Sequence, residues 1–128
     1  MDLGFLAPVG RVFLALLFIM SGVGKISDPA GMAAFIESQG LPGLLVWPTI
    51  VLEVGGGLLI ALGLLARPTA FLLAGFCVVT GVLYHLVPGL AGEMVDQGEV
   101  TAFLKNVAIA GGFTMIVVNG PGRFSLGS

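Results

Sequence analysis

Hydrophobic positions along the chain fall into four long blocks, each interrupted by only one or two strongly polar side chains. The blocks cover residues 5–25, 44–66, 69–87 and 101–118. Arg11 interrupts the first block, Glu53 the second, His85 the third, and Lys105 with Asn106 the fourth. A helix needs about 20 apolar residues to cross the hydrocarbon core of a bilayer. The pattern therefore predicts four membrane-spanning helices.

The segments between the blocks carry residues that begin and end helices. Ser27 or Asp28 can cap a helix that starts at Pro29, and apolar side chains recur at helical spacing through residues 29–39. We predict that this segment is a short amphipathic helix lying in the membrane interface between the first and second spans. For the other connections we predict a tight hairpin at residues 66–68, an acidic loop at residues 87–100 and a tail after the last span.

Composition supports the membrane interpretation. Of the 128 residues, 57% are hydrophobic and only 9% are charged, whereas soluble domains average about 25% charged residues. A cleaved signal peptide at the start would need a basic first segment, and the chain begins Met-Asp instead. We therefore expect one all-α domain over residues 1–128, an integral membrane four-helix bundle with the short interfacial helix between helices 1 and 2.

Charge and cysteine usage limit the chemistry. Five Lys and Arg against seven Asp and Glu give a net charge of −2, which argues against nucleic-acid binding. Cys77 is the single cysteine, so the chain forms no internal disulfide or dithiol, and His85 is the single histidine, so one chain cannot supply two histidines to a haem. Glu53 and His85 alone are too few ligands to predict a metal site.

Basic side chains also suggest an orientation. Alternating crossings place Arg11, Arg67 and Arg123 on one side of the membrane and Lys25 and Lys105 on the other, together with most of the acidic residues. Lysine and arginine accumulate on the cytoplasmic side. We therefore expect both termini in the cytoplasm.

In this topology, strongly polar side chains of all four spans lie at one depth, in the outer half of the bundle. They are Ser21, Lys25, Glu53, His85, Lys105 and Asn106. Ionisable residues within spans almost always face the bundle interior or a wet cavity, and pair there. We expect Glu53 to face the interior and to reach Lys105, Asn106 or Ser21, directly or through water. The alternative is that Glu53 only joins helices by hydrogen bonding.

Small residues would let the helices approach closely enough for these side chains to meet. We expect five glycines to lie at helix contacts: Gly22, Gly56, Gly57, Gly81 and Gly112.

An ordered set of motifs resembles the DoxX family of small bacterial inner-membrane proteins. The motifs are "GRVFLALLFIMSGVGK", "LEVGGGLLIALGLLARP", "YHL" and "FLKNVAIAGG", followed by "NGPGRFSL". The family pattern matches Arg11, Ser21, Gly22, Lys25, Glu53, Gly56, Arg67, His85, Lys105, Asn106 and the tail from Gly120 to Arg123. The resemblance implies a four-helix protein of the bacterial inner membrane. It also implies a setting in redox complexes, because the family takes its name from a membrane subunit of an archaeal thiosulfate:quinone oxidoreductase.

Two functions follow from these observations. In the first, the protein is a membrane subunit or accessory protein of a redox system and binds a quinone-like apolar ligand, with Glu53 and His85 handling protons and Lys25 or Lys105 balancing charge. We expect no covalently bound cofactor. The partners we expect are oxidoreductase subunits in the membrane or in solution, and the chain is compatible with a homo-oligomer. Catalysis by this chain alone is not expected. In the second, it is a non-catalytic membrane adaptor or small-solute permeation protein whose polar cluster is structural.

Overall fold

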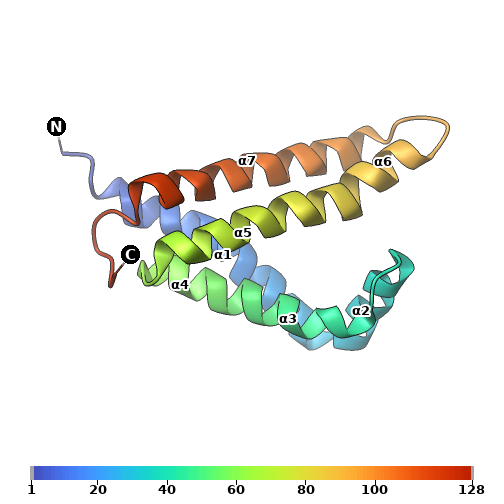
Figure 1. The fold of residues 1–128 in the computed structure, drawn as a ribbon, viewed down its shortest axis with the longest axis horizontal. Coiled ribbons are helices and arrows are strands. Elements are labelled where there is room, and N and C mark those ends of the chain that lie inside the picture. The colour runs from blue at the N-terminus through green and yellow to red at the C-terminus, as the bar shows by residue number, and fades with distance from the viewer. Residues whose placement is uncertain (1, 128) are drawn as a thin grey trace.

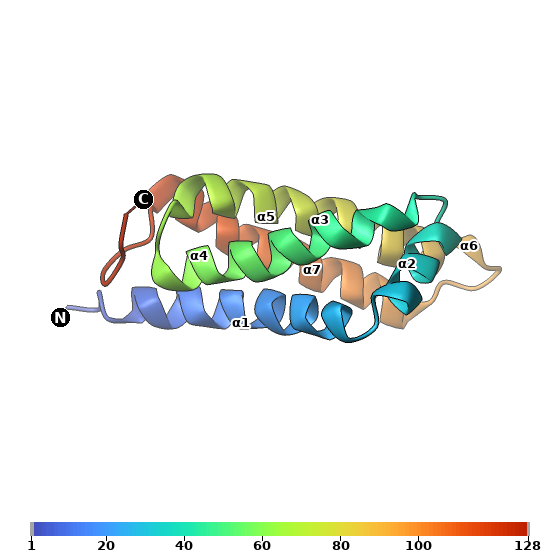
Figure 2. The same cartoon turned by 90° about the horizontal axis from the view of Figure 1, so that it is seen from below.

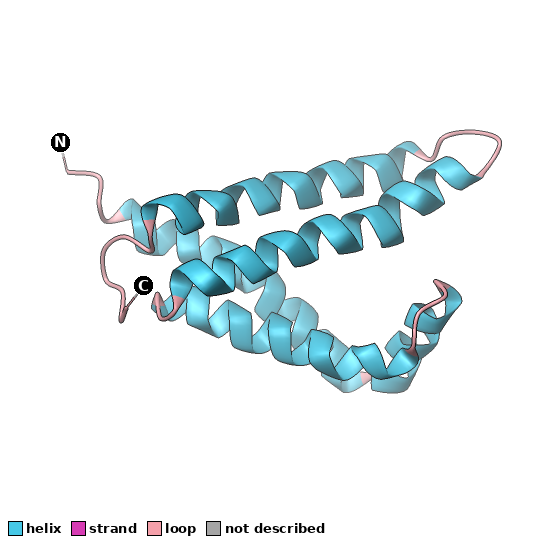
Figure 3. Cartoon of the chain, viewed as in Figure 1, coloured by secondary structure: helices cyan, strands magenta, loops and turns pink. Residues whose placement is uncertain are grey.

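The computed structural model describes residues 2–127, and all the helices and turns within them are shown in Figures 1 and 3. The α-helices are α1 (Leu6–Ser27), α2 (Pro29–Ser38), α3 (Val46–Ile50), α4 (Gly56–Leu62), α5 (Ala66–Gly81), α6 (Val87–Ala91) and α7 (Gln97–Asn119). A 3₁₀ turn, η1 (Gly43–Leu45), and two π-helical segments, η2 (Val51–Gly55) and η3 (Val82–Leu86), join some of them without a break. Four continuous helices, Leu6–Ser27, Gly43–Leu62, Ala66–Ala91 and Gln97–Asn119, are long and apolar enough to span a membrane. The predicted all-α four-helix architecture is confirmed.

The short helix α2 begins as its sequence predicts. The Asp28 carboxylate accepts a hydrogen bond of 3.0 Å from the backbone N–H of Gly31, and Pro29 occupies the first turn. After Ser38 the chain turns at Gly40, whose φ of +82° is readily adopted only by glycine. The short helix between the first two spans is therefore present, one residue shorter than predicted.

The hairpin between the second and third spans lies earlier than residues 66–68, so that prediction is wrong. The second span ends at Leu62, because Gly63 adopts a left-handed conformation (φ +67°), and Leu65 has a positive φ as well. Ala66 already belongs to α5. Pro68 is tolerated there because the first-turn N–H groups of a helix have no partner within the helix.

The third span also continues further than predicted, to Ala91 instead of residue 87. Pro88 lies inside it, where its ring would clash with the carbonyl of Tyr84 in a regular α-helix. The wider π turn of η3 (Val82–Leu86) ends just before Pro88 and accommodates the ring. The acidic loop is consequently short, and Asp96 caps α7 by accepting a hydrogen bond from the Glu99 N–H at 3.2 Å.

The helices form two pairs. In the first pair α1 packs along η2 and α4, and in the second α5 packs along α7. Figure 1 shows that the pairs meet near the two ends of the chain, which we call the converging end, and separate towards α2 and α6, the diverging end. Figure 2 shows α1 running beside α4 and α3 within the first pair. Phe18 of α1 and Phe113 of α7 join the pairs in the core, with ring centroids 5.4 Å apart in an edge-to-face arrangement.

The tail after α7 folds back over the converging end. The N–H groups of Leu126 and Gly127 donate to the carbonyls of Leu62 and Gly63 at 3.1 and 2.9 Å. From α1, the Arg11 guanidinium donates to carbonyl oxygens of the same tail. The tail thus bridges the first span and the hairpin that follows the second.

All five glycines expected at helix contacts lie against another helix. A Cβ atom on Gly22 would lie 2.5 Å from Val54 Cγ2, and one on Gly57 would lie 2.7 Å from Ile19 Cγ1. The corresponding distances are 3.1 Å from Gly81 to Asn106, 3.3 Å from Gly112 to Leu14 and 3.4 Å from Gly56 to Leu73. The closest approach is therefore between α1 and the second span.

We expect Gly22→Ala to lower the free energy of unfolding by about 1–3 kcal/mol, because the added methyl group overpacks this contact. Besides Val54 Cγ2, it would lie 3.2 Å from the Val54 backbone nitrogen, which cannot move independently of η2. Gly24→Ala is the matched control, since nothing lies within 4 Å of a Cβ there. Reversible unfolding in mixed micelles measures the difference; equal stabilities of the two variants would contradict the close approach.

Both ends of the described chain lie at the converging end (Figure 1), as an even number of spans requires. We expect this end to face the cytoplasm. In a Cys77→Ala background, a membrane-impermeant thiol reagent added to intact spheroplasts should label Ser27→Cys and Gln97→Cys, and should not label Ser128→Cys. Labelling of the last variant alone would reverse the orientation.

Candidate ligand-binding site

A cavity of about 230 Å³ lies between the two helix pairs in the diverging half of the bundle. Leu17, Phe18, Phe76 and Ile109 contribute apolar lining from three helices. Strongly polar side chains from both pairs complete the wall: Ser21, Lys25, Glu53, His85 and Asn106. An apolar cavity of about 150 Å³ holds a benzene ring. This cavity is large enough for a substituted six-membered ring.

On the first pair, Glu53 forms an ion pair with Lys25. Glu53 is only 4% exposed, and its Oε1 lies 2.7 Å from Lys25 Nζ. Lys25 Nζ also donates a hydrogen bond of 2.8 Å to Ser21 Oγ, one turn earlier in α1. Although the Lys25–Glu53 contact is close, no donor within residues 2–127 is aligned for a hydrogen bond to Oε1. The attraction is therefore mainly Coulombic, and Oε1 retains acceptor capacity.

The expected partner of Glu53 is thus corrected from Lys105, Asn106 or Ser21 to Lys25. The contact depends on the close approach at Gly22, which brings the backbone of α1 against η2. Glu53 also lies in the π segment, where an extra residue per turn changes the direction of side chains relative to an α-helix. π-helical segments occur often at functional sites.

On the second pair, His85 contacts Glu99 across the short loop. His85 Nδ1 lies 2.8 Å from Glu99 Oε2. A carboxylate only accepts hydrogen bonds, so Nδ1 carries the proton in this contact and Nε2 is the remaining polar atom of the ring. His85 is also in a π segment, η3, and lines the cavity. Glu99 thereby orients the imidazole.

Glu99 was not predicted as a site residue. The expected fourth span began at residue 101, which left Glu99 in a loop, whereas α7 begins at Gln97. The spacing Asp96-x-x-Glu99 resembles a capping box, in which a capping residue is followed three positions later by an acid. That signal would have placed Glu99 in the first turn of a helix, beside the end of the preceding span.

Asn106 and Lys105 have different surroundings, although they are adjacent. The Asn106 side-chain amide donates to the Cys77 carbonyl at 3.0 Å and joins α7 to α5. Lys105 is exposed on α7 and does not line the cavity. Successive side chains of a helix point about 100° apart, so when Asn106 faces α5, Lys105 faces away. The expectation that Lys105 joins the polar cluster is corrected.

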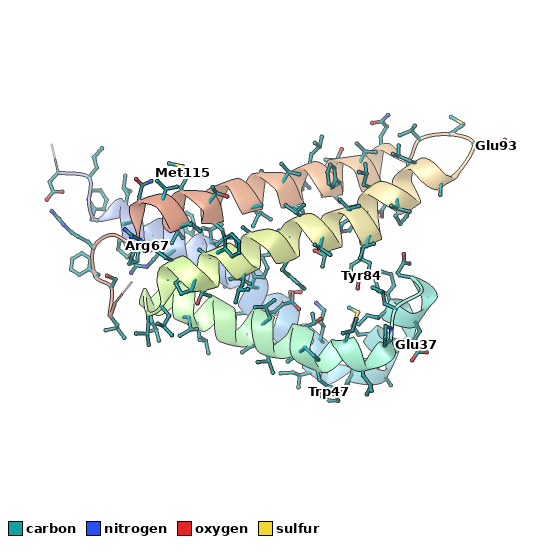
Figure 4. All side chains as sticks on the ribbon, viewed as in Figure 1. Glu37, Trp47, Arg67, Tyr84, Glu93 and Met115 are labelled. Atoms are coloured by element: carbon teal, nitrogen blue, oxygen red, sulfur yellow. The ribbon has the colours of Figure 1, made fainter. Side chains whose placement is uncertain are left out.

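Two aromatic side chains meet at the outer rim of the cavity. Phe35 of α2 and Tyr84 of η3 have ring centroids 5.4 Å apart at 63°, and both line the cavity. In Figure 4, Tyr84 extends from the second pair towards the space between the pairs. This edge-to-face contact joins α2 to the opposite helix pair. Among residues 2–127, no group of three or more His, Cys, Asp or Glu residues is arranged to hold a metal ion.

Comparisons with known proteins give a family and a location. A sequence model of the family described as DoxX matches residues 6–86. Over 125 residues the chain is 38% identical to Inner membrane protein YqjF of Escherichia coli (strain K12), which covers 98% of the chain and 90% of that protein. Over 131 residues it is 34% identical to Inner membrane protein YphA of the same organism, covering 98% and 93%. No solved structure matches.

Proposed function

Because the chain belongs to the DoxX family and is a multi-pass inner-membrane protein, we propose that it binds a small apolar ligand with a carbonyl or hydroxyl group at each end, a quinone-like molecule. The ligand occupies the cavity between the two helix pairs. In this role the protein serves as a membrane subunit or accessory protein of a redox system.

One observation carries the proposal: ionisable side chains from both helix pairs line one ring-sized cavity. Lys25 and Glu53 come from the first pair, and His85, held by Glu99, comes from the second. Reducing a quinone to a hydroquinone adds one proton to each of two oxygens at opposite ends of the ring. The apolar lining suits the ring, and polar side chains from each side suit the two oxygens.

The roles of the residues follow from their contacts. Nε2 of His85 is the ring atom left for a ligand oxygen, since Nδ1 is held by Glu99. It accepts from a hydroquinone hydroxyl in the neutral ring and donates to a quinone carbonyl in the imidazolium. Lys25 neutralises Glu53 and has further N–H donors for a second oxygen. The chain has one cysteine and therefore no dithiol to supply electrons. We expect a partner oxidoreductase subunit to supply them.

Ligand binding is tested by thermal unfolding in a non-ionic detergent with two probes of equal chain length. Decyl-benzoquinone should raise the melting temperature, whereas decylbenzene, which lacks the carbonyl oxygens, should not. A ligand at about 100 times its dissociation constant adds about 2.7 kcal/mol to stability, which is readily measured. Equal shifts with both probes would indicate non-specific binding of the alkyl chain and contradict the proposal.

His85→Ala separates binding from stability. The His85–Glu99 contact is about one-third exposed, so its loss should change the free energy of unfolding by less than about 1 kcal/mol, while the shift caused by decyl-benzoquinone should fall markedly. Lys105→Ala, on the outward face of α7, is the control and should bind the probe normally. If His85→Ala and Glu53→Gln both destabilise the fold and no quinone analogue shifts the melting of the unmodified protein, the cluster is a structural latch.

A further inference from the structure

Arg11 is a buried cation at the converging end, far from the cavity between the helix pairs. It is 2% exposed, and its guanidinium donates to the carbonyl oxygens of Pro121, Arg123 and Phe124 at 2.5, 2.8 and 2.7 Å. Within residues 2–127 no carboxylate forms an ion pair with it, and its Nε–H has no hydrogen-bond partner. Carbonyl dipoles alone offset a full positive charge.

Arg11 also lines a second cavity, of about 430 Å³, which runs between the first turns of α1 and the last turns of α7. Its walls are apolar, with Leu6 and Leu14 on α1 and Met115 on α7. Gly10 and Gly112 expose backbone along the same groove. None of its lining residues belongs to the ligand cavity described above. The groove is therefore a separate feature.

The charge around this groove is positive. The Arg67 guanidinium lies close to Gly120, which lines the groove, with Nη2 3.1 Å from the position of a Cβ on that glycine. In Figure 4, Arg67 is at the same end as the two chain ends. Among the described residues, neither Arg11 nor Arg67 forms an ion pair, whereas Arg123 pairs with Asp2. Two arginines at this end are left without an acid.

We propose that this groove binds an anionic phospholipid, with an acyl chain between α1 and α7 and the phosphate at the Arg11 end. Apolar side chains that line the groove on both helices are exposed, Leu6 to 48% and Met115 to 61%, so the groove faces the lipid phase. Basic pockets between spanning helices bind anionic headgroups. Neither Arg11 nor Arg67 forms an ion pair within residues 2–127, so their positive charge attracts a phosphate and favours an anionic lipid over a zwitterionic one.

The test fills the groove without disturbing the fold. Nothing lies within 4 Å of a Cβ on Gly10, so Gly10→Leu places its side chain in the groove. Gly75→Leu on α5 is the matched control, because a Cβ there also meets nothing within 4 Å and Gly75 does not line the groove. Both variants keep Arg11 and the tail intact.

The unmodified protein in non-ionic detergent is titrated with phosphatidylglycerol or phosphatidylcholine, and binding is followed by native mass spectrometry and melting temperature. We expect phosphatidylglycerol to bind and stabilise, Gly10→Leu to weaken this binding about ten-fold, and Gly75→Leu to bind normally. Equal binding of phosphatidylcholine, equal binding by the two variants, or the same stabilisation by inorganic phosphate alone would each overturn the proposal. So would a lipid-independent dimer that Gly10→Leu dissociates.

Discussion

Removing residues 120–128 should lower the free energy of unfolding by about 3–5 kcal/mol, the range found when a buried charge loses its partner. Within residues 2–127, the three hydrogen-bond acceptors of the Arg11 guanidinium all lie in the tail. Without them the Arg11 cation, which is 2% exposed in the full-length protein, loses its carbonyl partners. Helix content by circular dichroism during unfolding in mixed micelles measures the loss.

A second substitution distinguishes the stranded charge from the loss of tail packing. Arg11→Met in the truncated protein should recover most of the stability, because methionine fills similar space without a charge. In the full-length protein the same substitution should destabilise, since three carbonyl oxygens lose their donor. If the truncated protein gains nothing from Arg11→Met, its instability comes from lost packing at the hairpin, where the tail bonds to Leu62 and Gly63, and not from a stranded Arg11 charge.

The number and type of helices were predictable because membrane-spanning blocks are defined by length and hydrophobicity alone. Helix α2 was predictable because Asp28 and Pro29 are strong start signals and Gly40 is a strong stop signal. The third span was predicted to end too early, at residue 87. Proline is usually taken as a helix end, but the π turn of η3 allows the helix to pass through Pro88.

The hairpin was misplaced for a different reason. Glycine often ends an α-helix because it adopts the left-handed backbone conformation found there, as Gly63 does. Glycines are frequent throughout this chain, however, and the signal did not stand out from Gly55, Gly56 and Gly57. Leu65 also adopts a positive φ, which is rare for a leucine and has no signature in the sequence.

For the candidate site, the depth of the polar side chains in the membrane was predictable from the sequence, but the direction in which each points from its helix was not. Residue numbers and the rise per residue place Ser21, Lys25, Glu53, His85 and Asn106 at one level, and all five line one cavity. The rotation of each helix decides which side chains meet, and it depends on packing between helices. Two π segments change that rotation within the second and third spans. Lys25 contacts Glu53 because α1 packs closely against η2 at Gly22, whereas Lys105 lies on the exposed side of α7.

The Lys25–Glu53 pair gives the second large expected effect. Glu53→Leu leaves the Lys25 ammonium without its carboxylate, and Lys25→Met leaves the 4%-exposed Glu53 carboxylate alone. Each substitution should cost about 3–5 kcal/mol, whereas the double substitution should restore stability to within about 1 kcal/mol, because apolar side chains can replace a buried ion pair at little cost. Lys105→Met, on an exposed position, should change little.

The restored double variant then separates the two functions, since its fold is intact and its polar pair is absent. If the cavity binds a quinone through this pair, the double variant should melt like the unmodified protein and yet lose most of the stabilisation by decyl-benzoquinone, while Lys105→Met retains it. The remaining His85–Glu99 contact on the opposite helix pair can bind only one of the two ligand oxygens. A double variant that binds the probe as tightly as the unmodified protein would instead make Lys25 and Glu53 a structural connection between α1 and η2, with no part in ligand binding.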